Sequence, residues 1–242
     1  PYAVELEHID AAIEAHDRVS TRRRLGIAAT ARVLLCLGSI EPRKSQAMLV
    51  AAFAKVADRH PDALLVLVGE TDHAYCAGYR VALRDYIARA GLEDRVRVVP
   101  NTEAPFPWHA VADALVCASD IESLPRAILE AMAFGTPVLS TRVFGVPEVI
   151  EDGRTGYLCE MRDVADLARG LERVLGASAA DLQAVGRAGS EYVRAEHRPD
   201  AYAETMLRLL RGFVATPDAL PGELLRERER SGGPDAAPAP AR

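Results

Sequence analysis

From Arg32 onward, short apolar runs alternate with longer stretches in which apolar residues recur at helical spacing. This alternation is typical of a parallel β-sheet with helices on both faces, because each parallel strand must return through a crossover. It predicts an α/β fold with a doubly wound, Rossmann-like parallel sheet. The expected strands cover residues 33–37, 64–68, 96–99, 114–117, 138–141 and 157–159. The expected helices cover residues 45–59, 78–90, 108–112, 125–134 and 164–175.

The two ends of the chain differ from this central pattern. Residues 1–30 are charged and weakly patterned, with three consecutive arginines ahead of Gly26, and we expect a linker at a domain boundary. Residues 31–196 are then expected to form one domain. Residues 215–242 are rich in Pro, Ala and Gly and contain no core-forming run, so we expect a disordered tail.

Composition excludes several classes of partner and compartment. The chain has 29 Lys and Arg against 35 Asp and Glu, a net charge of −6, which argues against a general nucleic-acid-binding surface. It has no apolar run of the roughly 18 residues that a membrane span needs and no signal peptide at its start, which favours a cytoplasmic protein. Four cysteines lie far apart with no C-x-x-C pair, so we expect buried reduced thiols rather than disulfides or a zinc site. They are Cys36, Cys76, Cys117 and Cys159.

The stretch from Ser119 to Glu130 is an expected strand exit followed by a carboxylate, a turn and a new helix. Ser123 is expected to cap the helix, Pro125 to lie in its first turn, and Gly135 to end it in a left-handed conformation. Free backbone N–H groups at such a helix start attract anions. The loop therefore suits a phosphate or a sugar hydroxyl.

Two carboxylates, Glu122 and Glu130, bracket this helix start. They lie roughly 12 Å apart along a helix axis, at about 1.5 Å per residue. That separation is too long for an acid/base pair on one bond, since glycosidase carboxylates lie about 5 to 9.5 Å apart. It suits the two ends of an extended ligand such as a nucleoside diphosphate sugar. Judged by spacing alone, the favoured interpretation of the pair is a surface loop residue and a solvated helix residue.

A second loop, residues 38–45, follows the first expected strand. It matches neither the P-loop pattern nor G-x-G-x-x-G. Gly38 allows a ligand to approach the backbone closely, and Arg43 and Lys44 supply two cations before a helix, as a diphosphate requires. An exposed basic turn is the alternative interpretation of the same residues.

A third loop, residues 144–156, carries three glycines around one short helical turn. The plainest interpretation is that these glycines only mark the turns between elements of secondary structure. The histidines are scattered without metal-ligand spacing, and there is no D-x-D dipeptide. We therefore expect no metal and no cofactor apart from the donor substrate.

Taken together, these segments resemble the donor domain of the retaining glycosyltransferase family 4, the glycosyl transferases group 1. The signature E-x7-E followed by A-M-A-x-G-x-P-V runs from Glu122 through Glu130 to Val138. The pattern G-x-P-E-x-I-x-D-G-x-x-G recurs at residues 145–156. The resemblance covers about residues 32–193 and implies the C-terminal, nucleotide-sugar-binding half of a GT-B fold.

The resemblance also implies roles for single residues. Glu122 is expected at the catalytic centre, in contact with the transferred sugar, and Glu130 at the ribose hydroxyls. Lys44, with help from Arg43, is expected to neutralise the diphosphate, beside Gly38 and Ser39. Many family members carry Arg at the position of Ser39. Two backbone segments complete the expected donor site. The first, against sugar and diphosphate, is Ser123, Leu124, Pro125 and Arg126; the second, against the base, is Pro100, Asn101 and Thr102.

The implied activity is metal-independent transfer of a sugar, hexosyltransferase-like, from a UDP- or GDP-sugar to an acceptor with retention of configuration. The family needs a preceding acceptor-binding domain, which is absent from this chain, so we expect a partner domain or separate chain and weak or no activity by this half alone. Any peripheral membrane association would come through that missing domain. Residues 197–214 resemble the helix that crosses back to it. The alternatives are a non-catalytic nucleotide-sugar-binding module and a GT-B-type sugar epimerase.

Overall fold

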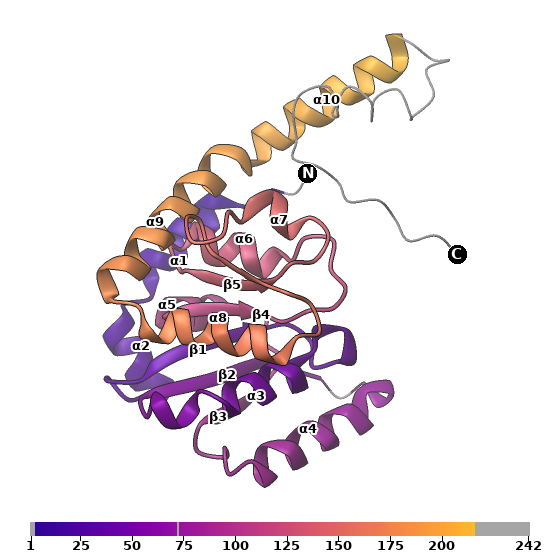
Figure 1. Cartoon of the computed structure of the whole chain (residues 1–242). Coiled ribbons are helices and arrows are strands. Elements are labelled where there is room, and N and C mark those ends of the chain that lie inside the picture. The colour runs from indigo at the N-terminus through magenta and orange to yellow at the C-terminus, as the bar shows by residue number, and fades with distance from the viewer. Residues whose placement is uncertain (1–2, 72, 216–242) are drawn as a thin grey trace. The chain divides into compact units, whose positions relative to one another are not determined.

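The computed structural model describes residues 3–71 and 73–215 and contains one six-stranded, fully parallel sheet (Figure 1). The spatial order of the strands is β3-β2-β1-β4-β5-β6. Their bounds are β1 Arg32–Leu37, β2 Ala63–Glu70, β3 Val96–Pro100, β4 Ala114–Cys117, β5 Val138–Thr141 and β6 Tyr157–Cys159. The expected α/β fold class is confirmed, and all six expected strands are present.

The strand order reverses between β1 and β4, which are neighbours although two strands separate them in the sequence. In an open parallel sheet, ligands bind beyond the carboxyl ends of the strands at such a reversal point. The loops that follow β1 and β4 therefore meet at the place where a ligand is expected.

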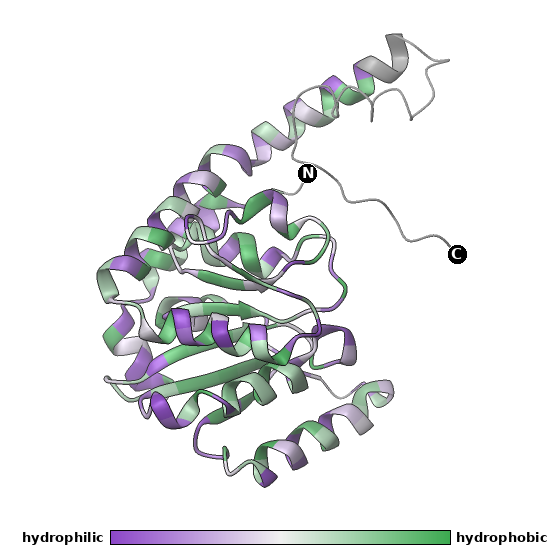
Figure 2. Ribbon diagram, in the orientation of Figure 1, coloured by the Kyte–Doolittle hydropathy of each residue, from purple (hydrophilic) through white to green (hydrophobic). Residues whose placement is uncertain are grey.

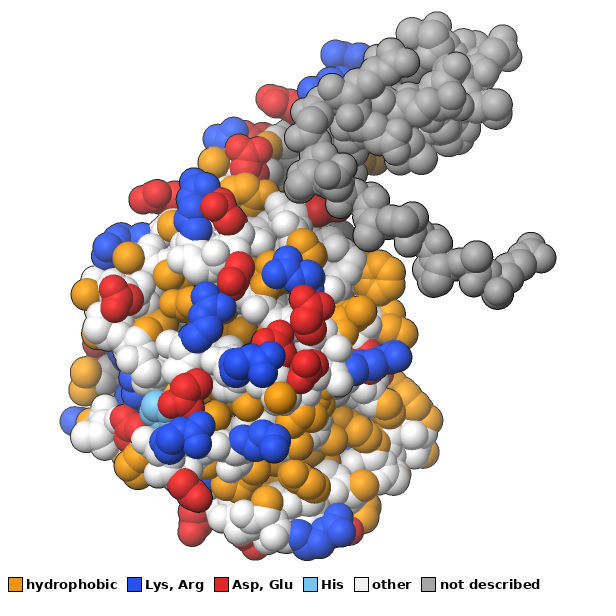
Figure 3. Space-filling view, in the orientation of Figure 1, with side chains coloured by type: hydrophobic (Ala, Val, Ile, Leu, Met, Phe, Trp, Pro, Cys, Tyr) orange, Lys and Arg blue, Asp and Glu red, His pale blue; other side chains and the backbone are white. Residues whose placement is uncertain are grey.

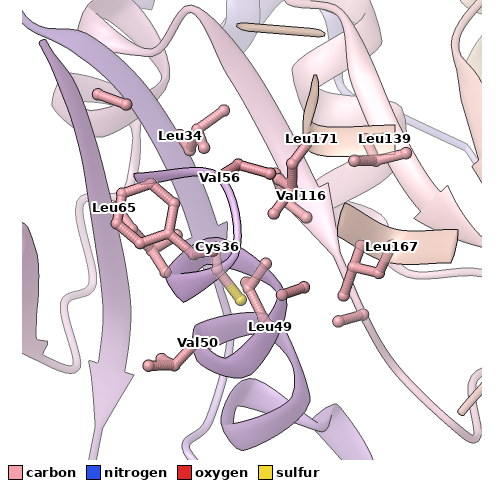
Figure 4. Packing of buried hydrophobic residues seen from close by; sticks show 14 of the residues in the cluster. Leu34, Cys36, Leu49, Val50, Val56, Leu65, Val116, Leu139, Leu167 and Leu171 are labelled. Atoms are coloured by element: carbon pink, nitrogen blue, oxygen red, sulfur yellow. The ribbon is translucent and has the colours of Figure 1, made fainter. Parts of the chain in front are cut away.

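Both faces of the sheet are buried, and alternate residues of β1 show how. Leu34 and Cys36 point into one apolar cluster, and Val33 and Leu35 into the other. Figure 4 shows Cys36 and Leu34 among residues of the first cluster, and Figure 2 shows the apolar strands at the centre of the domain. The helices over the first cluster are α3 Gln46–Ala54, α4 Ala77–Arg89 and α8 Val164–Gly176. Those over the second are α1 Leu6–Ala15, α5 Phe106–Val111 and α6 Arg126–Ala133.

The four cysteines are free thiols, three of them buried, as expected. Burial raises the pKa of the Cys36 and Cys159 thiols to about 12. Both therefore stay protonated at neutral pH and act as small apolar side chains in the core.

One long helix was not expected from the sequence. Helix α9, Ala179–Glu196, packs against α6, and its glycines explain the weak pattern. A Cβ atom added at Gly186 would lie 2.0 Å from the carbonyl oxygen of Gly135. Glycine lowers helix propensity by about 1 kcal/mol relative to Ala, but here it allows close approach to the end of α6. The other helices are α2 Arg18–Arg24, α7 Val146–Val149 and α10 Pro199–Ala215.

The opening segment, where a linker was expected, folds into α1 and α2. Ile9 of α1 is buried in the second cluster, and the side chain of Arg22 in α2 is only 8% exposed. Asp113, just before β4, accepts hydrogen bonds from Arg22 Nη2 at 2.9 Å and from the backbone N–H of Val33 at 2.7 Å. Its other carboxylate oxygen accepts from Arg18 Nη2 at 2.6 Å. One carboxylate thus joins α2 to two strands.

The described part of the chain divides into two units at Pro199, and α10 belongs almost wholly to the second unit. Helix α10, Pro199–Ala215, lies where a helix over residues 197–214 was expected. The expected disordered tail lies outside the described residues, apart from Ala215. Among the helices that the structure describes, none is long and apolar enough to cross a membrane. On the face shown in Figure 3, basic and acidic side chains are interspersed.

Replacing Asp113 tests the attachment of α2. The Asp113→Ala variant should lose about 2–4 kcal/mol of unfolding free energy, because the enclosed Arg22 guanidinium loses its carboxylate partner and the Val33 N–H loses its acceptor. Asp113→Asn, which keeps one acceptor oxygen, should lose less. Urea denaturation followed by circular dichroism measures both. A loss below about 0.5 kcal/mol in Asp113→Ala would show that the opening segment is not held by this carboxylate.

Candidate functional site

The candidate site lies where β1 and β4 end, at the reversal of strand order. The chain leaves β1 at Gly38, whose φ of 139° favours glycine. A Cβ atom built there would lie 3.6 Å from Lys44 Nζ, so the lysine side chain covers this glycine. A Cβ atom at Gly69, the last residue but one of β2, would lie 2.2 Å from the carbonyl oxygen of Gly38. The end of β2 and the loop after β1 therefore pack backbone against backbone.

The loop after β1 makes a 3₁₀ turn over Pro42–Lys44 before α3 begins. The helix starts at Gln46, one residue later than expected, because Ser45 adopts a left-handed conformation with φ 51°. Gln46 Nε2 donates to the carbonyl oxygen of Ser39 at 2.8 Å. This bond fixes the turn, and Arg43 and Lys44 therefore lie at the mouth of the site, by which we mean the space between the loops that follow β1 and β4.

Glu122 is the centre of an ionic cluster at this mouth. Its carboxylate contacts Lys44 Nζ and also accepts from Arg43 Nη1 at 2.9 Å. Arg43 Nη2 reaches the carboxylate of Glu41 at 2.7 Å. The Glu122 side chain is 12% exposed and that of Lys44 16%, so water screens their attraction only weakly. From the sequence, Glu122 is expected at the sugar and Lys44 at the diphosphate, and the structure brings the two side chains into direct contact.

The start of α6 differs from the expectation in its cap. Pro125 occupies the N-cap position, no side chain caps the helix, and Arg126 is its first residue. The expected cap by Ser123 is therefore wrong. Leu124 is buried, and the carbonyl oxygen of Ser123 accepts from the Gly145 N–H at 2.9 Å, so the chain before Pro125 is extended and anchored to the next loop.

The end of α6 agrees with the expectation. Gly135 has φ 75°, and its N–H and that of Thr136 bond back to Met132 and Ala131, as in a Schellman cap.

Glu130 lies on α6, and its side chain is less exposed to solvent than the sequence suggested. Its side chain is 14% exposed, and Arg126 Nη2 approaches its carboxylate at 3.3 Å. Burial raises the pKa of this carboxyl, and the nearby Arg126 partly offsets the shift. His109 of α5 faces the same carboxylate, with Nε2 3.9 Å from Oε2. His109 is not among the site residues expected from the sequence, because a single histidine in a short apolar helix gives no pattern that indicates a function.

The expected base-binding residues form a separate part of the edge, at the end of β3. Pro100 is the last residue of that strand, and the N–H of Asn101 donates to the carbonyl oxygen of Glu70 at 2.7 Å. The Thr102 hydroxyl bonds locally to Ala104. Asn101 and Thr102 thus follow the carboxyl end of β3, three strands away from β4 in the sheet.

The loop after β5 holds an exposed aromatic residue in an unfavourable backbone conformation. Phe144 has φ 37°, and 71% of its surface is exposed. Its neighbour Gly145 packs on Ser123, since a Cβ atom there would lie 2.7 Å from the Ser123 carbonyl oxygen. The left-handed conformation costs a non-glycine residue roughly 1–2 kcal/mol, and little burial of the ring offsets it.

Among the residues that the structure describes, no three His, Cys, Asp or Glu side chains group so that they could hold a metal ion.

Phe144→Gly should raise the free energy of unfolding by about 1 kcal/mol, because glycine adopts positive φ without the steric cost. Gly145→Ala should lower it, because the new methyl group meets the Ser123 carbonyl. Chemical denaturation of both variants against the parent measures the difference. Destabilisation by Phe144→Gly would show that the ring contributes more than its backbone costs.

His109 should make stability pH-dependent. Burial lowers the pKa of its imidazole from 6.5 to about 4. Below pH 6.5 His109 is therefore protonated in the unfolded chain but still neutral in the folded chain. The free energy of unfolding consequently falls as the pH falls towards 4. Between about pH 8 and pH 5, the parent should lose about 2 kcal/mol more unfolding free energy than His109→Gln. Urea denaturation at each pH gives the two slopes, and equal slopes would contradict a buried neutral imidazole.

Comparison with known proteins agrees with this geometry. The family model described as Glycosyl transferases group 1 matches residues 17–192. A D-inositol 3-phosphate glycosyltransferase from Geodermatophilus obscurus is 34% identical over 224 residues, which cover 90% of this chain and 49% of that protein. The chain thus spans about half the length of such curated relatives.

Two solved structures show the same fold. The C-terminal domain of the glycosyl transferase group 1 protein LpcC from Francisella tularensis is 21% identical with a TM-score of 0.69, over 82% of this chain and 96% of that one. Anabaena HepE, solved in complex with UDP-glucose, is 23% identical with a TM-score of 0.73, over 84% of this chain and 53% of its own. The sheet described above is therefore half of a GT-B fold. With its motifs and its fold, the chain belongs to the glycosyl transferases group 1 family.

Proposed function

We propose that this chain is the donor-binding half of a retaining, metal-independent glycosyltransferase that uses a UDP- or GDP-sugar. The observation that carries the proposal is the cluster of Glu122, Arg43 and Lys44 at the reversal point of the sheet, directly before α6. Two cations and a carboxylate there match the diphosphate and the sugar hydroxyls of one ligand. The UDP-glucose bound to HepE, a protein of the same fold, supports this class of donor.

The ionic cluster suggests how a donor enters. The diphosphate competes with Glu122 for Arg43 and Lys44, because phosphate oxygens are strong acceptors for both cations. Glu122 is then released to accept hydrogen bonds from the hydroxyls of the sugar. During transfer, the two cations stabilise the negative charge that develops on the diphosphate leaving group. No proton transfer by the pair Glu122 and Glu130 is required.

The other expected contacts extend along the edge of the sheet. Glu130 accepts from the ribose hydroxyls, the backbone of residues 123–126 lies against sugar and diphosphate, and the backbone of residues 100–102 holds the base. The acceptor would be bound by a further domain or chain, since full-length relatives are about twice as long as this chain. We therefore expect the isolated chain to bind nucleotide and to transfer sugar weakly or not at all.

Titration of UDP, GDP and ADP by isothermal calorimetry tests the proposal. Lys44→Ala and Arg43→Ala should each weaken UDP or GDP binding by roughly 10- to 100-fold, the value of a charge-assisted hydrogen bond. Glu122→Gln should instead strengthen binding of the free diphosphate, because it removes the competing carboxylate. The same variant should reduce the extra affinity that the attached sugar provides.

Arg59→Ala is the matched control. Arg59 pairs with Glu172 of α8 and lies just before β2, at the amino ends of the strands and away from the candidate site. Its nucleotide affinity should equal that of the parent. Unchanged affinity in both Lys44→Ala and Arg43→Ala would refute the assigned phosphate site. Absence of UDP and GDP binding by the parent would refute the proposed function itself.

A further inference from the structure

His109 is a buried polar side chain that the proposed donor site does not use. It is 1% exposed, and neither ring nitrogen has a hydrogen-bond partner. A buried polar group without a partner costs about 1–3 kcal/mol relative to one that has a partner. Native proteins rarely keep such groups, and their presence calls for an explanation.

His109 has an aromatic neighbour on its ring face and a carboxylate near Nε2. Its ring stacks on Phe134 with centroids 5.3 Å apart and planes 19° apart, and Phe134 stacks in turn on Phe106. This stacking fixes the plane of the imidazole. The carboxylate of Glu130 lies 3.9 Å from Nε2, beyond hydrogen-bond distance by less than 1 Å.

Glu130 is the partner that is able to move. Its side chain has one more rotatable bond than that of histidine, and its ion pair is with Arg126, whose side chain is 75% exposed. A pair with so exposed an arginine is weak and reorganises easily. A small rotation of the carboxylate would close the gap to Nε2 without disturbing the stacked rings.

We propose that His109 is a positioning residue for recognition of the ribose: when a nucleotide binds, its Nε2–H donates to Glu130 and holds the carboxylate toward the ribose hydroxyls. This inference rests on the proposed function, in which Glu130 accepts from those hydroxyls. The imidazole is neutral in its buried place, because burial lowers its pKa to about 4, so it donates from one nitrogen only. The proton stays on His109 throughout.

The consequence is selectivity for ribose. A carboxylate held by a fixed N–H loses less freedom when it binds two hydroxyls than one tethered only to an exposed arginine. Removing the N–H should therefore weaken the binding of nucleotides that carry ribose hydroxyls. The binding of their 2′,3′-dideoxy analogues should be nearly unaffected. If His109 had a merely structural role, its replacement would weaken the binding of both kinds of nucleotide to the same extent.

Calorimetric titration of UDP and GDP, each beside its 2′,3′-dideoxy analogue, tests the proposal in the full chain. The variants are His109→Phe, which keeps the stacking and lacks the donor, and Glu130→Gln, which weakens the acceptor. The parent should prefer the ribose nucleotide. In His109→Phe this preference should fall roughly 3- to 10-fold, as for the loss of one hydrogen bond, while dideoxy affinity stays within about twofold of the parent.

A preference that is unchanged in His109→Phe would overturn the assignment of His109 while the proposed function stands. A parent that binds neither UDP nor GDP would refute the proposed function instead. A second measurement needs no variant: ¹⁵N NMR of the parent should show a protected His109 Nε2–H when the ribose nucleotide is added. The dideoxy analogue should not produce this signal, and equal signals with both nucleotides would also overturn the proposal.

Discussion

The parallel arrangement of all six strands is the constraint on which the rest of this structure depends. Because every strand points the same way, all six carboxyl ends lie at one edge, and every connection must return over a face of the sheet. The returning helices bury both faces, which is why β1 is apolar on both sides. The reversal of strand order between β1 and β4 then brings Gly38 and Glu122, far apart in the sequence, to one mouth.

Side chains of opposite charge pair with one another at that mouth. Arg43 and Lys44 are held by the turn that follows β1, and Glu122 follows β4, so the sheet itself sets their contact. Both cations thus have a carboxylate partner, and Lys44, whose side chain is only 16% exposed, carries no unpaired charge in this enclosed place. At the other end of α6, His109 and Glu130 are a pair of the opposite kind, close together without a hydrogen bond.

Several features of the fold and of the candidate site were predictable from local pattern. Strand positions follow from apolar runs, and the end of α6 at Gly135 follows from a residue that adopts positive φ without cost. The cap of α6 was not predictable in the same way. Ser123 has a good capping side chain, but burial of Leu124 and the bond from Gly145 to Ser123 extend the chain there, so that Pro125 takes the cap position. Tertiary contacts outweighed a local preference.

Helix α9 and the opening helices were missed for related reasons. Gly186 weakens the helical pattern in the sequence, yet it is needed because α9 approaches the end of α6 too closely for a side chain. Arg22 looks like part of a charged linker until Asp113, ninety-one residues later, pairs with it in a nearly enclosed place.

By itself, the sequence determined the order of the six strands and of the helices between them, the family motifs and the chemical types at the mouth, since these depend on local periodicity and residue identity. Only the tertiary structure decided which of those groups touch, because contacts such as Lys44 to Glu122 and His109 to Glu130 depend on the spatial order of strands and on the packing of side chains between helices.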